Sequence, residues 1–443
     1  MTLSRLQSLT PSRSTQTIGL PECLFIVYVM LFLAGGLLPL VVPDTGPKET
    51  ADSDRASYLL QVALCLMSMV FLLPRWHQLL RGLRAAMPVV LLFSINAISV
   101  IWSGTRAATI HSLMYLAITV ALGVYLGVRL SIQQQIQFLC VVVGIAAIAT
   151  VTLVVFAPWR AFDPYDGSLR GDFLTKNWLG GAMGLGAISF YFLPARRGMR
   201  LLRAAAIATC VALIVFADSI APLVGLAVLV ALRPALIGLR THSFRRKLVA
   251  PICALLSGIL LLVFNMEAFL NFVGRNSFLT GRIPVWVVVI GDILKRPWFG
   301  YGYGAYWARE AGNADYVARL VQWFPGQSHN GLLQICLSVG LLGLIVFLAV
   351  YAKVFKQAVR LQAGGAARTD LWPVAFLIFT MIHNMTESGL LEPYDLSTAL
   401  FIALVVVLNR RHSARRRNAS SDRQRRNGVR LCALQGPAAA SGT

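Results

Sequence analysis

Apolar runs with almost no charge follow one another along most of this chain, and they limit its fold more than any other feature. A helix crosses the hydrocarbon core of a bilayer with about 20 apolar residues. The chain is 57% hydrophobic and only 13% charged, whereas soluble proteins are about 25% charged. The sequence therefore predicts an all-α polytopic integral membrane protein with about 12 transmembrane helices. The candidate spans are 23–42, 56–73, 88–102, 107–128, 136–157, 178–193, 204–217, 219–238, 248–264, 331–352, 371–386 and 396–408.

The loops between these runs alternate in charge, and this alternation predicts the orientation of the chain. Basic residues collect in the loops that stay in the cytoplasm. Of the 40 Lys and Arg residues, 27 lie near the two termini and in the loops 74–87, 129–135, 194–203, 239–247 and 353–370. We therefore expect both termini in the cytoplasm and the more acidic loops outside. The net charge of +22 has the same origin, so the lipid bilayer, and no nucleic acid, is the predicted partner.

Three parts follow from this layout. Residues 1–22 form a cytoplasmic N-terminal segment, residues 23–408 form the transmembrane domain, and residues 409–443 form a basic cytoplasmic tail that we expect to be disordered. The arginines of the tail are interpreted as an anchor on anionic lipid. The seven cysteines form no CxxC pair and lie at no metal spacing from a histidine, so neither a disulfide framework nor a metal site is predicted.

One large external loop, residues 265–330, precedes the span 331–352 and offers the most room for a site exposed to water. Within it, residues 283–295 are apolar but too short to cross the bilayer, and they carry Asp292. An extra crossing here would also move the basic segments that follow to the outside, against the charge bias. We expect an interfacial helix.

His329 is the first candidate catalytic residue. Ser328 is a plausible N-cap for the helix that follows, which would put His329 in the first turn and Asn330 beside it. The positive end of a helix dipole disfavours a charged imidazole, so His329 is expected to be neutral and able to accept a proton. The alternative interpretation is an interfacial histidine that caps a helix.

Cations on the external side form the second candidate group. Arg282 begins the short apolar helix, and Arg170, Lys176 and Asn177 lie just before or at the start of the span 178–193. Helix N-termini with Arg and Lys bind phosphate and pyrophosphate groups. Each cation taken alone could equally extend toward lipid headgroups. Together, these cations are unexpected on the external face, from which the charge bias should remove basic residues.

Two further external segments carry polar or aromatic side chains. The segment Gly300–Trp307 (GYGYGAYW) is compatible with a sugar-stacking surface or with an aromatic belt at the membrane interface. Glu387, which follows His383 and Asn384, could orient His329 or a substrate hydroxyl, or could cap the next helix.

Five motifs follow one another along the chain: RGDFLTKNWLG, TGRIPVW, RPWFGYGYGAYW, SHNGLLQICLSVGLLGL and HNMTESGLL. Together they resemble the O-antigen ligase and polysaccharide polymerase superfamily, and most closely its exopolysaccharide-production branch. The resemblance covers roughly residues 90–400. It implies a multi-pass enzyme of the bacterial inner membrane, with its active face in the periplasm. Such enzymes transfer a glycan from an undecaprenyl-pyrophosphate carrier to an acceptor sugar hydroxyl, with neither metal nor cofactor.

By the same resemblance, His329 is expected to be the general base and Arg282 and Arg170 the pyrophosphate ligands. The supporting residues are Lys176, Asn177, Asn330 and Glu387. The expected substrates are a lipid-linked glycan and an acceptor glycan, with other polysaccharide-export proteins as candidate partners. The spelling of the motifs favours a polymerase over an O-antigen ligase that uses a lipid A core. A transporter would carry charges inside its spans, and these spans are nearly free of charge; an assembly subunit is the remaining alternative.

Overall fold

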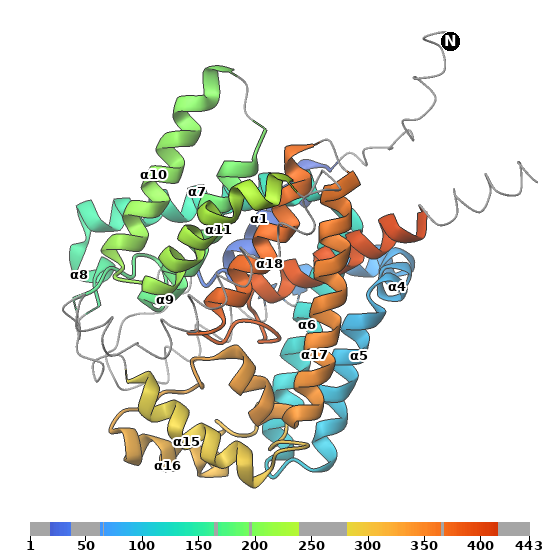
Figure 1. Cartoon of the computed structure of the whole chain (residues 1–443), viewed down its shortest axis with the longest axis vertical. Helices are drawn as coiled ribbons and strands as arrows, with labels where there is room; N and C mark the ends of the chain where they lie inside the picture. The colour runs from blue at the N-terminus through green and yellow to red at the C-terminus, as the bar shows by residue number, and fades with distance from the viewer. Residues whose placement is uncertain are drawn as a thin grey trace, which may run out of the picture.

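The computed structural model describes residues 18–36, 63–64, 66–163, 167–194, 197–238, 281–364 and 367–414. Within these ranges the chain is helical apart from turns, loops and one isolated bridge between Phe162 and Leu169. The all-α class is therefore confirmed for the part of the chain that is described (Figure 1). The predicted span 248–264 and the tail beyond residue 414 lie outside the described residues.

The helices of the first half come in this order: α1 (Leu20–Leu33), η3 (Leu73–Arg75), α4 (Trp76–Ala85), α5 (Met87–Ile98), η4 (Ser99–Ile101), α6 (Arg106–Arg129), α7 (Ile132–Phe156), α8 (Pro158–Ala161), α9 (Lys176–Phe192), η5 (Arg197–Met199), α10 (Arg200–Phe216) and α11 (Ile220–Gly238). Those of the second half are α15 (Arg282–Lys295), η7 (Arg309–Ala311), α16 (Asn313–Val321), α17 (Gly331–Gly364), η8 (Arg368–Leu371), α18 (Trp372–His383) and a final helix over residues 396–414.

Three of the described helices, α6, α7 and α17, are long and apolar enough to cross a membrane. A fourth span results if the helices Leu66–Ala85 and Met87–Ile101, which meet at an angle of 87°, form one broken span. Shorter apolar helices lie at Leu20–Leu33 and Ile220–Pro234. A polytopic membrane protein agrees with these lengths, and the number of about 12 spans stays a prediction.

Loops predicted to share a side of the membrane contact one another. On the predicted cytoplasmic side, Glu22 accepts hydrogen bonds from both Arg129 (2.6 Å to Nε) and Tyr125 (2.6 Å). On the same side, the Asn409 side chain donates to the Ala85 carbonyl at 2.7 Å. These contacts join segments far apart in sequence that the charge pattern assigns to the same side of the membrane. Which face is external stays a prediction.

Two segments predicted as irregular are helical. The basic segment 74–87 contains α4, whose Leu79 and Leu83 pack toward the core while Arg81 and Arg84 remain exposed. An amphipathic helix of this kind can lie along a membrane surface instead of crossing it. The last helix also continues to residue 414, past the predicted boundary at residue 408.

The long helix α17 is broken at Gly340, and the loop after α15 fills the break. Gly340 has φ 70°, and a Cβ there would lie 2.2 Å from the backbone of Trp298. Around the break, Tyr301 N–H donates to the Leu337 carbonyl at 2.7 Å and Leu341 N–H donates to the Pro297 carbonyl at 2.7 Å. The loop thus satisfies backbone groups that a broken span would otherwise leave unpaired.

The Gly300–Trp307 motif forms the interior of a subdomain made of residues 281–330, which contains α15 and α16. Tyr303 and Tyr306 are 4% and 2% exposed, and the Tyr306 hydroxyl donates to buried Asp292 at 2.5 Å. Gly302, at φ 105°, lets the backbone pass against Ser103, whose Cβ would be only 2.7 Å from an added Cβ. Because these tyrosines are buried, neither the sugar-stacking surface nor the aromatic belt describes them. The motif instead packs α15 and the loop against α17 and the start of α6.

Candidate functional site

The segment from Ser328 to Gly331 forms a tight turn before α17, and its capping differs from the prediction. The Asn330 side-chain oxygen accepts from Leu332 N–H (3.0 Å) and Leu333 N–H (3.2 Å), so Asn330 is the N-cap. Ser328 Oγ donates to the Asn330 carbonyl at 2.8 Å. The prediction that Ser328 caps the helix was wrong, because the amide of Asn330 reaches the free N–H groups first.

His329 therefore precedes the helix, outside its first turn, and has a left-handed backbone with φ 49°. This conformation is strained for a residue other than glycine and is common at functional sites. The Asn330 amide holds the turn by donating to the Met385 carbonyl at 3.1 Å. The Trp286 indole of α15 donates to the Ser328 carbonyl at 2.9 Å. Hydrogen bonds to other segments thus hold both sequence neighbours of His329, Ser328 and Asn330.

Glu387 joins His329 to Arg282. One carboxylate oxygen, Oε1, forms an ion pair with Arg282 Nη2, and the other, Oε2, lies 3.3 Å from His329 Nδ1. The side chains of Arg282, His329 and Glu387 are 23%, 15% and 9% exposed. Three predicted site residues from three distant segments therefore meet directly. The contact between Glu387 and His329 agrees with the first of the three alternatives for Glu387, that it orients His329.

The charge state of Glu387 sets the tautomer of His329. Burial by itself would raise the pKa of Glu387, but the hydrogen bond with His329 and the positive charge of Arg282 hold that pKa below its usual range. An ionised carboxylate only accepts hydrogen bonds. A neutral His329 must then donate from Nδ1, which leaves the lone pair of Nε2 unprotonated.

The Nε2 atom of His329 is buried and has no hydrogen-bond partner among the described residues. Buried polar atoms without a partner are uncommon and need an explanation. The ring of Trp323 packs over the imidazole, with 5.7 Å between ring centroids. A substrate hydroxyl that reached Nε2 would supply the missing partner.

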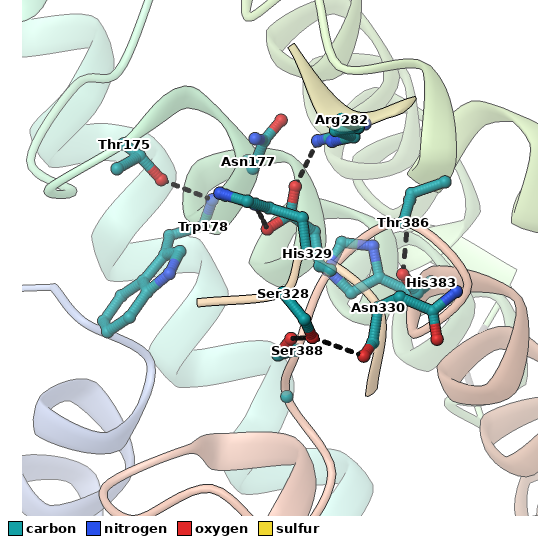
Figure 2. Close-up of polar contacts among 12 residues, drawn as sticks. Thr175, Asn177, Trp178, Arg282, Ser328, His329, Asn330, His383, Thr386 and Ser388 are labelled. Carbon is teal, nitrogen blue, oxygen red and sulfur yellow. Dashed lines mark hydrogen bonds and ion pairs between the residues drawn. The ribbon is translucent and has the colours of Figure 1, made fainter. Parts of the chain in front are cut away.

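The start of α9 carries two of the predicted residues. Thr175 Oγ1 accepts from Trp178 N–H and caps the helix, so Lys176 and Asn177 occupy its first two positions as predicted. Ser219 Oγ donates to Asn177 Oδ1 at 3.3 Å. Figure 2 shows Thr175, Asn177 and Trp178 in the same close-up as Arg282 and His329. This helix start carries the positive end of the helix dipole.

His383 connects α9 to the Glu387 loop. An added Cβ on Gly181, one turn after Asn177, would lie 2.9 Å from His383 Nε2, so the imidazole packs directly on the helix backbone. The Asn384 side-chain oxygen then accepts from Gly389 N–H and Leu390 N–H at 2.9 Å each. This amide fixes the loop that carries Glu387.

Arg170 lies in the loop that leads to α9. Its backbone N–H donates to the Ala161 carbonyl at 2.9 Å, and its side chain is half-buried. In the same loop, the buried Asp172 accepts from Thr150 at 2.7 Å, and burial raises the pKa of Asp172 to about 6. The loop is thereby fixed to α7. Direct contact unites Arg282, His329 and Glu387, whereas Arg170 and Lys176 belong to the neighbouring α9 segment.

The sequence reasoning overlooked Trp323, which packs over His329 and beside Gly281. A signal was present in the aromatic pair Trp323-Phe324 a few residues before His329. Among the described residues no three His, Cys, Asp or Glu side chains gather as metal ligands would.

Comparison with curated proteins identifies distant relatives. The chain is 27% identical over 299 residues to the exopolysaccharide production protein ExoQ of Rhizobium meliloti, covering 61% of this chain and 66% of that protein. It is 34% identical over 84 residues, or 18% of this chain and 20% of the relative, to a protein of Rickettsia conorii named "Putative polysaccharide ligase". A protein of the same description from Rickettsia prowazekii is 35% identical over 112 residues, 24% of this chain and 28% of the relative.

The aligned segments thus span just under two thirds of the first relative and less than a third of the other two. No protein-family model matches the chain. The chain is nevertheless a distant homologue of an exopolysaccharide production protein and of proteins named as polysaccharide ligases. The resemblance to the O-antigen ligase and polysaccharide polymerase superfamily is confirmed at this level.

Proposed function

We propose that this protein is a membrane glycosyltransferase that assembles polysaccharide on the periplasmic face of the bacterial inner membrane. It transfers a glycan from an undecaprenyl-pyrophosphate carrier to a hydroxyl of an acceptor sugar. The observation that supports this most is the buried Nε2 of His329, which has no hydrogen-bond partner among the described residues, on an imidazole whose Nδ1 lies against Glu387. The names of the distant relatives agree with a role in polysaccharide assembly.

A glycosyl pyrophosphate is already activated, so the enzyme needs to deprotonate the acceptor and to stabilise the departing charge. The acceptor O–H gives its proton to His329 Nε2 while its oxygen bonds to the anomeric carbon. The bond from that carbon to the pyrophosphate oxygen breaks, and the electron pair leaves with the carrier. A well-placed base contributes about 10²- to 10⁴-fold in rate.

Arg282 and the α9 start receive the pyrophosphate. Among the described residues, Arg282 contacts Glu387 through Nη2. A guanidinium has five N–H donors, so its other donors can bind phosphate oxygens. Lys176 and the first N–H groups of α9 add positive potential, and Arg170 approaches from the preceding loop. Glu387 keeps Arg282 and His329 a fixed distance apart, which aligns the donor with the base.

Direct displacement by the acceptor inverts the anomeric centre. Nuclear magnetic resonance of the product linkage, compared with that of the lipid-linked donor, measures this. A product with retained configuration, or a trapped glycosyl-enzyme, would contradict a single displacement with His329 as base.

Repeat-unit polymerisation is the proposed reaction, and ligation of a finished glycan to a lipid A core is the alternative within the same chemistry. The longest comparison, with an exopolysaccharide production protein, favours polymerisation. The decisive experiment is the profile of lipid-linked and released glycans in a deletion strain that carries wild type, His329→Ala or His77→Ala. His77 is an exposed histidine on α4, away from the site, and serves as the matched control.

Single repeats that accumulate on the carrier in the His329→Ala strain, with polymer lost, are the expected result. Long lipid-linked chains that never reach a lipid A core would instead identify a ligase. If the His329→Ala profile equals wild type while the deletion strain makes no polymer, His329 has no catalytic role. The protein would then be a transporter or an assembly subunit of a glycan-export complex.

A further inference from the structure

A shallow groove of about 520 Å³ lies along one face of α16 and is lined in part by Trp323, whose ring packs against His329. Helix α16 buries Ala314 and Val317, and Val317 belongs to the same apolar cluster as Val285 and Val289 of α15. The groove occupies another face, because its helical residues are spaced three and four apart. Its lining residues are Asp315, Ala318, Arg319, Gln322, Trp323 and Phe324.

We infer that this groove is the subsite for the acceptor oligosaccharide, with Trp323 and Phe324 as stacking surfaces that lead the acceptor hydroxyl to His329. The inference rests on the proposed function and adds to it a binding surface for one of the two substrates. Sugar rings offer an apolar face and a rim of hydroxyls. A groove that binds them therefore combines exposed aromatic rings with hydrogen-bonding side chains.

The groove has both kinds of side chain. Trp323 and Phe324 are 38% and 52% exposed, which leaves ring surface available for stacking. Asp315, Arg319 and Gln322 are exposed along the same face and provide an acceptor, a donor and an amide that does both. The combination matches a polar ligand with apolar faces.

The position of Trp323 links the groove to both halves of the proposed chemistry. Its ring packs over His329, and an added Cβ on Gly281 would lie 2.8 Å from its indole Nε1. Gly281 directly precedes Arg282, so the indole contacts the two segments that carry the arginine and the histidine. Gln322, with φ 63°, ends α16 in a left-handed conformation and turns the chain into Trp323. A sugar stacked on this indole would therefore contact the side chain that packs against the His329 imidazole.

A lipid-facing surface has a different composition, and the same subdomain contains one for comparison. On α15, Ile283, Val287, Ile290 and Leu294 follow one another at helical spacing, and all are exposed. No charged residue interrupts this stripe, as expected of a helix that faces acyl chains. The face of α16 that lines the groove instead carries an acidic, a basic and an amide side chain, namely Asp315, Arg319 and Gln322. This polar composition favours a glycan over the bilayer as the partner of the groove.

The test measures acceptor binding without turnover. Full-length His329→Ala protein in nanodiscs is titrated with the repeat-unit oligosaccharide released by mild acid from lipid-linked glycan of the source strain, and binding is followed by calorimetry. Adding Trp323→Ala is expected to weaken binding roughly tenfold, and Trp323→Phe by less, because a smaller ring still stacks. Trp298→Ala is the matched control: Trp298 is 57% exposed and lies outside the groove.

Equal affinity with and without Trp323→Ala would overturn the inference, and so would an equal loss in Trp298→Ala. Brominated phospholipid in the nanodiscs provides a second arm. The quenching that Trp323→Phe abolishes is the part due to Trp323, because the chain has nine tryptophans. If the bromine quenches this part and the oligosaccharide does not change it, the groove contacts the bilayer and the inference fails. These outcomes are separate from the proposed function, which the glycan profile of the His329→Ala strain tests independently of acceptor affinity.

Discussion

Glu387→Gln isolates the contact on which the proposed mechanism depends. Glutamine has nearly the same shape, but its side chain has one accepting oxygen and one donating NH₂ group. The glutamine oxygen can accept a hydrogen bond from His329 or from Arg282. The NH₂ group then faces the other of these two donors, with which it cannot form a hydrogen bond. One of the two charge-assisted contacts is therefore lost in a place where all three side chains are less than a quarter exposed.

A hydrogen bond to a charged group contributes about 1.5–3 kcal/mol, so we expect Glu387→Gln to lower the free energy of unfolding by about that amount. The effect on rate should be larger than this loss of stability implies. Without the carboxylate, His329 is free to carry its proton on Nε2, where it cannot act as a base. We expect the transfer rate to fall by about 10²-fold or more at saturating substrates.

The assay compares wild type, Glu387→Gln and Glu310→Gln in nanodiscs with lipid-linked donor and acceptor oligosaccharide. Glu310 is an exposed carboxylate of the same subdomain, so its loss should change neither rate nor stability. A double-mutant cycle with Arg282→Gln then measures the coupling of the pair. Wild-type rate and thermal stability in Glu387→Gln would refute the role of Glu387 in orienting His329.

Three other predictions concern stability and metal dependence. The pKa of Glu387 is lowered in the fold. Its ionised carboxylate therefore stabilises the fold at pH values above the pKa of the unfolded state, and this stabilisation is lost as the pH falls through the pKa of the folded state. Thermal melts should show a decrease in melting temperature below pH about 4.5, and the decrease should be smaller in Glu387→Gln. Gly340→Ala should destabilise the fold by more than about 1 kcal/mol, since an added Cβ meets the Trp298 backbone. Gly291→Ala, whose added Cβ meets nothing within 4 Å, should instead be neutral or stabilising; equal melting temperatures for the two variants would contradict this account. Glycan transfer should continue in EDTA, and a complete loss of transfer that a divalent ion restores would show that a metal takes part.

Several features followed from the sequence alone because they depend on neighbouring residues. Apolar runs predicted helices, and the contacts of Glu22 with Arg129 and of Asn409 with Ala85 agree with the loops that the charge bias assigned to one side. The short helix α15 and the start of α9 at Lys176 were predicted from local composition and capping. The motifs also identified Arg282, His329 and Glu387 as candidates.

Only the tertiary structure decided how those candidates combine. Glu387 meets His329 across 58 residues and Arg282 across 105 residues, and no local pattern determines such distances. Tertiary contacts likewise placed Tyr303 and Tyr306 in the interior and allowed the break at Gly340, since the loop at Pro297 satisfies its backbone. The physical reason is that helix formation depends on the residues of a few turns. Packing and hydrogen bonding between distant segments depend on how the whole chain fills space.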